Sequence, residues 1–122
     1  QYVRSELNEL LCHVAEYMDY PDGTKKILYF HGLYLREKLY KFLTDQGVEF
    51  KKIYDKDGKV TAYSSYSLDI KVASDLIGFL VNEGGDINYV DGDGDTIISI
   101  AAKCGQSNLI KFLGGRVNKE LI

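Results

Sequence analysis

The fold of this chain is decided by residues 84–113, which read GGDINYVDGDGDTIISIAAKCGQSNLIKFL. The spacing Asp91-x-x-Gly94-x-Thr96 is typical of a tight turn, in which Asp91 and Thr96 bind backbone groups and Gly94 permits the reversal. A short apolar segment through Ala101 follows, and a second one ends at Leu113. The stretch therefore predicts a turn followed by two short helices.

In these positions the stretch resembles one ankyrin repeat. Residues 85–88, Gly-Asp-Ile-Asn, stand where that family opens a unit, and the Asp-x-x-Gly-x-Thr turn and the small Ala-Ala pair follow in order. The sequence departs from the family at Ile97, where the family has proline, and at Ser99, where it has histidine. The resemblance implies a helical pair that stacks on neighbouring units.

An internal repeat supports this interpretation. The spacing Leu-x-x-Phe-Leu occurs three times, as Leu39-x-x-Phe42-Leu43, Leu76-x-x-Phe79-Leu80 and Leu109-x-x-Phe112-Leu113. The copies start 37 and 33 residues apart, against a family period of about 33 residues. Each copy predicts an amphipathic helix whose apolar face is covered by a neighbouring unit.

The fold class expected from these patterns is all-α, an ankyrin-like solenoid of helix-turn-helix units with short hairpin tips. Residues 1–122 form one domain in this interpretation: an N-terminal helix within 1–21, then units at 22–54, 55–90 and 91–122. Residues 25–31 are expected to form the first helix of the first unit. In the second unit the first helix stays open, because residues 62–66, Ala-Tyr-Ser-Ser-Tyr, favour a strand-like or loop conformation.

The composition limits the function classes. Charged residues make up 27% of the chain and the net charge is −3, which gives no reason to expect nucleic acid or a membrane as the main partner. The two cysteines, Cys12 and Cys104, are too few for a disulfide framework. An intracellular setting, in the nucleus or cytoplasm, fits this composition.

A metal-dependent or thiol-dependent enzyme is the alternative from another class. Asp91, Asp93 and Asp95 resemble the start of a calcium loop, but Ala102 stands where the closing glutamate belongs. The soft ligands Cys12, His13, His31 and Cys104 do not have zinc-site spacing. His13 is expected to be a partly exposed helical histidine. We therefore expect no catalytic residue, no cofactor and no metal site.

The family resemblance implies protein–protein recognition without chemistry. Family members bind partners with hairpin tips and first helices, which here places the partner-binding residues at Lys56, Asp57, Lys59, Gly92, Asp93, Asp95, Lys103 and Cys104. Residues 68–71 and 94–103 are also similar to ankyrin regions of fungal G1/S cell-cycle-box transcription factors, which would make the chain a regulatory fragment. Viral or bacterial host-targeting ankyrin proteins are the alternative source of such divergent repeats.

Overall fold

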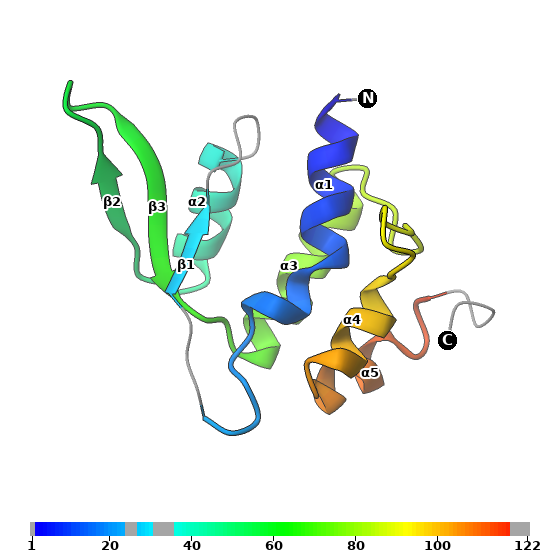
Figure 1. Ribbon diagram of the computed structural model, residues 1–122. Helices are drawn as coiled ribbons and strands as arrows, with labels where there is room; N and C mark the ends of the chain where they lie inside the picture. The colour runs from blue at the N-terminus through cyan, green and yellow to red at the C-terminus, as the bar shows by residue number, and fades with distance from the viewer. Residues whose placement is uncertain (1, 24–26, 31–35, 118–122) are drawn as a thin grey trace.

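Helices and strands are both present in the computed structural model, which describes residues 2–23, 27–30 and 36–117 (Figure 1). The helices are α1 (Tyr2–Cys12), the 3-10 helix η1 (Val14–Tyr17), α2 (Arg36–Asp45), α3 (Ile70–Asn82), α4 (Ile97–Lys103) and α5 (Ser107–Leu113). The strands are β1 (Ile27–Phe30), β2 (Lys51–Tyr54) and β3 (Val60–Tyr66). Figure 1 shows the sheet and α2 on one side, α1 and α3 in the middle, and α4 with α5 on the other side.

The predicted all-α ankyrin-like solenoid is wrong, because an antiparallel three-stranded sheet occupies the region where the first helix of the first unit was expected and the first helix of the second unit was left open. The central strand β3 pairs with both β1 and β2. β1 lies inside residues 25–31, for which a helix was predicted, and β3 covers the segment left open in the second unit. Aromatic and β-branched residues in these segments fit a pleated surface better than a helix. The protein is a small mixed α/β structure.

The three predicted second helices are confirmed as α2, α3 and α5. Their repeated leucines are buried at Leu39, Leu43, Leu76, Leu80, Leu109 and Leu113. Each phenylalanine between them is half-buried, and the rings of Phe42 and Phe79 stack with centroids 4.6 Å apart. α3 contacts both α2 and α5, so the stripes share one core. Among the three expected units, only the third has its predicted first helix in the described part of the chain.

The N-terminal helix predicted within residues 1–21 is divided into α1 and η1, which bury Leu7, Leu11 and Val14. α1 ends at Cys12, His13 has a φ of −103°, and η1 follows. The backbone then pairs with Leu68, whose amide donates to the Tyr17 carbonyl at 2.8 Å and whose carbonyl accepts from the Asp19 amide at 2.9 Å. This junction joins the N-terminal helices to the end of β3.

The predicted turn at 91–94 is confirmed, and a turn at 55–58 has the same hydrogen-bond pattern. Asp91 Oδ1 accepts from the amides of Asp93 and Asp95 at 2.9 and 2.8 Å, and Gly94 has a φ of +82°. Asp55 Oδ1 accepts from the equivalent two amides at 2.8 and 3.0 Å. The first turn joins β2 to β3, whereas the second leads into α4.

Gly94→Ala is expected to lower the free energy of unfolding by about 1–2 kcal/mol, because a side chain disfavours the left-handed backbone. The added Cβ would meet no atom within 4 Å, so the loss is one of backbone conformation alone. Gly92→Ala is the matched control: it lies in the same turn, outside the left-handed region and in open space. Its effect should stay within about 0.5 kcal/mol. Equal urea midpoints for the two variants would contradict this account of the turn.

Candidate functional site

The 91–95 turn is fixed to the start of α4 by a capping box. Thr96 Oγ1 accepts from the Ser99 amide at 3.2 Å, and Ser99 Oγ accepts from the Thr96 amide at 2.8 Å. Ser99, one of the two departures from the ankyrin pattern, therefore completes the cap. The turn is held in one orientation relative to the helix.

Asp95 forms an ion pair with Lys103 at the other end of α4. Lys103 Nζ donates to Asp95 Oδ1 at 2.7 Å, and Ser99 Oγ donates to the same oxygen at 3.0 Å. The hydrogen bond from Lys103 holds the pKa of Asp95 below its usual range, and the same bond raises the pKa of Lys103. Because the Asp95 side chain is only 19% exposed, this residue is part of the framework rather than a free surface charge.

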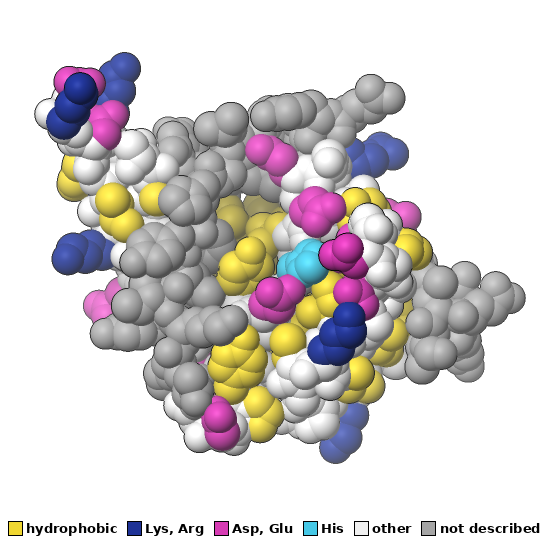
Figure 2. Space-filling view, in the orientation of Figure 1, with side chains coloured by type: hydrophobic (Ala, Val, Ile, Leu, Met, Phe, Trp, Pro, Cys, Tyr) yellow, Lys and Arg dark blue, Asp and Glu magenta, His cyan; other side chains and the backbone are white. Residues whose placement is uncertain are grey.

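His13 lies among three carboxylates on the same face of the molecule. Its Nδ1 hydrogen-bonds to Glu16, and its Nε2 lies 3.1 Å from Asp91 Oδ2 and 3.8 Å from Glu9 Oε2. We call these four residues the His13 cluster, and Figure 2 shows acidic side chains gathered around the histidine. Burial disfavours the charged imidazole, but Glu16 and Asp91 outweigh it, so the pKa of His13 is raised.

Two of the three carboxylates of the His13 cluster, Glu9 and Asp91, also accept hydrogen bonds from groups outside the cluster. Tyr89 donates its hydroxyl to Glu9 Oε1 at 2.7 Å, and this bond raises the pKa of Tyr89. The amide of Asp95 is the main reason that the pKa of Asp91 is lowered, and its effect exceeds the opposing effect of burial. The Asp91 side chain is only 6% exposed. These contacts therefore hold Asp91, the residue that the 91–95 turn contributes to the cluster, in place.

Cys12 lies directly beneath this cluster. Its side chain is buried, and its Sγ donates to the Asp95 carbonyl oxygen at 3.6 Å. Burial, with the negative charge of Asp91 and other nearby acidic residues, raises the pKa of the Cys12 thiol to about 12. A nucleophilic cysteine needs a thiolate, so this environment disfavours a thiol-dependent reaction at Cys12.

The sequence-predicted partner residues fall into two separate groups. The first lies at the β2–β3 turn and consists of the exposed residues Lys56, Asp57 and Lys59. The second surrounds α4 and consists of exposed Gly92, Asp93 and Lys103 with half-buried Asp95 and Cys104. Figure 1 places the β2–β3 turn and the segment before α4 on opposite sides of α1. The two groups therefore do not form one continuous ridge.

The geometry of the 91–95 turn also bears on the calcium interpretation. Asp91 Oδ1 is occupied by two backbone amides, and Asp95 Oδ1 is occupied by Ser99 and Lys103. These oxygens hold the turn and the helix start rather than converging on one point. Of the four soft ligands, His31 lies outside the described part of the chain.

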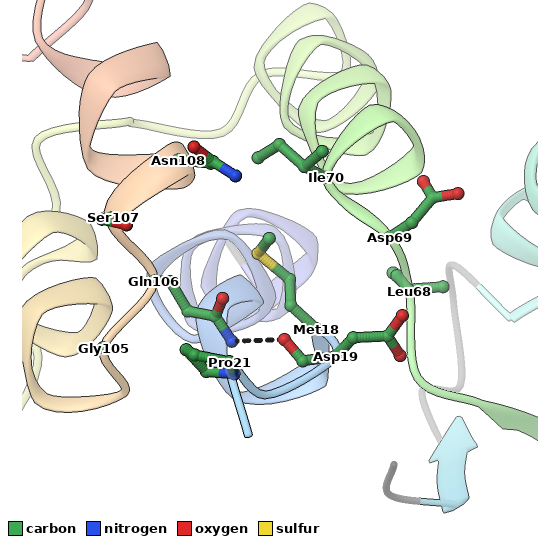
Figure 3. A pocket seen from close by; sticks show the side chains of 10 residues that line it. All are labelled: Met18, Asp19, Pro21, Leu68, Asp69, Ile70, Gly105, Gln106, Ser107 and Asn108. Carbon is green, nitrogen blue, oxygen red and sulfur yellow. Dashed lines mark hydrogen bonds between the residues drawn. The ribbon is translucent and has the colours of Figure 1, made fainter. Parts of the chain in front are cut away.

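One pocket lies between the first residues of α3 and α5 (Figure 3). Gln106 closes one side by donating from Nε2 to the Asp19 carbonyl at 2.9 Å, and the side chains of Ile70 and Asn108 face each other across the pocket. Its volume is about 240 Å³, below the range of about 300–1,000 Å³ typical of small-molecule sites. The pocket does not favour a substrate of ordinary size.

Comparison of the chain with family models, curated proteins and solved structures finds no match. Within residues 2–23, 27–30 and 36–117, no helix has both the length and the apolar character needed to cross a membrane.

Proposed function

We propose that this protein is a non-catalytic protein–protein interaction module that binds its partner with the 91–95 turn and the adjoining surface of α4. The observation that carries the proposal is the position of Asp93, which is exposed at the tip of a turn fixed by Asp91 and by the α4 capping box. A preorganised turn loses little conformational entropy when it binds. The resemblance of residues 84–113 to an ankyrin unit supports the same function.

The charge of this surface favours a basic segment on the partner protein. Five carboxylates lie on or beside the turn, at Glu9, Glu16, Asp91, Asp93 and Asp95, against the two possible cations His13 and Lys103. Complementary lysine and arginine side chains would be attracted to this excess of negative charge. An intracellular setting, in the nucleus or cytoplasm, is part of the proposal and rests on the cysteine content.

Asp93→Lys is expected to abolish capture of the partner while leaving the fold unchanged. Asp93 is exposed, so its substitution should alter the free energy of unfolding by no more than about 0.5 kcal/mol. Asp95 is unsuitable for the same test because its carboxylate binds Lys103 and Ser99. Thermal melts and quantitative capture of binding proteins by the immobilised chain, at two salt concentrations, measure both effects.

Lys56→Glu is the matched control, because it reverses an exposed charge in the β2–β3 turn, which has the same hydrogen-bond pattern as the 91–95 turn. It should fold and capture the same protein as the unmodified chain does. Loss of capture in Lys56→Glu but not in Asp93→Lys would place the partner on the β2–β3 turn instead. Unchanged capture in both variants would contradict the assignment of either turn.

A further inference from the structure

The His13 cluster and the thiol beneath it contain the ligand types of a transition-metal centre. We propose that Cys12 Sγ, His13 Nε2, Asp91 Oδ2 and Glu9 Oε2 bind one zinc-class divalent ion. The set combines a thiol, an imidazole and carboxylates, which together suit zinc better than calcium or magnesium. It is assembled from α1, from the residue that follows α1 and from the 91–95 turn. The site shares Glu9, His13 and Asp91 with the proposed partner surface, but it is inferred from ligand geometry and requires no partner protein.

The distances suit a tetrahedral ion. Zinc bonds of about 2.0–2.3 Å at tetrahedral angles place neighbouring ligand atoms roughly 3.3–3.6 Å apart. His13 Nε2 lies 3.1 Å from Asp91 Oδ2 and 3.8 Å from Glu9 Oε2, on either side of that range. The ligand atoms of Cys12, His13 and Asp91 all lie within 4.8 Å of one another. Glu9 is not part of that group of three, so its exposed side chain must rotate to supply the fourth ligand.

Three of the four ligands already have the outer contacts that metal ligands usually have. Glu16 binds His13 at Nδ1, which leaves Nε2 facing the other ligands. Two backbone amides hold Asp91 through Oδ1 and leave Oδ2 directed at His13. Tyr89 holds Glu9 through Oε1, and the other oxygen of that carboxylate is the one near His13. In these three residues one polar atom is held by an outer contact, which leaves the other available to an ion.

Burial changes across the site in a way that provides an entry path. Cys12 is 1% exposed and the Asp91 side chain 6%, whereas the side chains of His13 and Glu9 are 29% and 52% exposed. An ion can therefore enter from the Glu9 side and reach the thiol at the bottom. Binding breaks the S–H bond of Cys12 and forms a metal–sulfur bond, and the proton is released to solvent. A proton on His13 Nε2 is released in the same way.

Zinc titration of the purified, chelator-treated chain by calorimetry tests the proposal, with Co²⁺ as a spectroscopic probe of thiolate ligation. One ion should bind per chain, and Co²⁺ should produce a thiolate charge-transfer absorption. His13→Gln should weaken zinc binding by more than Glu16→Gln, which removes only an outer contact and should weaken it about 10–100-fold. His13 and Glu16 are both partly exposed. We therefore expect these two variants to fold normally, even if Cys12→Ser does not fold.

Two controls separate this site from nonspecific binding. Cys104→Ser should keep the cobalt–thiolate absorption, and Cys12→Ser should lose it. Asp93→Asn, on the same turn but outside the ligand set, should bind zinc as the unmodified chain does. Absence of one-to-one binding in the unmodified chain, or equal affinity in His13→Gln, would overturn the proposal and leave His13 as an ion-pair partner only. These measurements require no partner protein, so their outcome is independent of the proposed interaction function.

Discussion

Leu76→Ala is expected to lower the free energy of unfolding by about 2–5 kcal/mol, the usual loss for removing a fully buried leucine side chain. Leu76 lies in the middle of α3 and is completely buried. Because α3 contacts α1, α2 and α5, a cavity at this point loosens several helix contacts together. Domains of this size are stable by about 5–15 kcal/mol, so the variant should show a large drop in urea midpoint.

Val81→Ala is the control for this prediction. It removes apolar atoms from the same helix at a position that is 39% exposed. Its effect on the free energy of unfolding should stay within about 0.5 kcal/mol. A loss at Val81 equal to that at Leu76 would mean that α3 presents a different face to the core.

The helices could be predicted because their signals are local. In α2, α3 and α5 the leucines of each stripe recur at helical spacing, and that spacing alone identifies the buried face. The turn at 91–95 was equally predictable, because Asp91 binds amides two and four residues ahead and Gly94 supplies the left-handed conformation. Contacts within a few residues leave a pattern that one sequence can show.

The sheet depends in part on pairing between segments that are distant along the chain. The ankyrin resemblance also led to a helix being predicted in place of one strand. Ile27 of β1 pairs with Tyr66, far along the chain, whereas β2 and β3 pair across the 55–58 turn that joins them. The ankyrin template of residues 84–113 predicted a helix over residues 25–31, where β1 lies, and left the first helix of the second unit open. In residues 62–66 the tyrosines and serines disagreed with that template, and there the local propensity was the better guide.

The His13 cluster could not be predicted from spacing. His13 and Asp91 are separated by 78 positions and meet only because α1 packs beside α4. The sequence showed Cys12 and His13 as adjacent soft ligands, but nothing in it indicated which carboxylates would face them. The ion pair of Asp95 with Lys103 could not be predicted for a related reason, because the two residues lie at opposite ends of α4 and meet only once the helix has formed.

Two glycines at α3 are expected to respond to alanine with opposite signs. Gly78 lies on the exposed side of the helix, and a Cβ there would meet no atom within 4 Å. Gly78→Ala should raise the free energy of unfolding by about 0.4–1 kcal/mol, because alanine restricts the unfolded chain and favours the helix. At Gly85, just past the helix, a Cβ would lie 3.0 Å from the Leu80 carbonyl oxygen and 3.2 Å from Leu11 Cδ2.

Gly85→Ala should lower the free energy of unfolding by about 1–3 kcal/mol, as overpacking of a well-fitted contact usually does. The backbone has little room to move away, since the Gly85 amide donates to the Leu80 carbonyl at 2.9 Å and the next amide, of Asp86, donates to Asn8 of α1 at 2.8 Å. This segment therefore ties the end of α3 to α1. Urea unfolding of the two variants beside the unmodified chain measures both effects, and a shift of the same sign at the two glycines would contradict this close contact between residue 85 and α1.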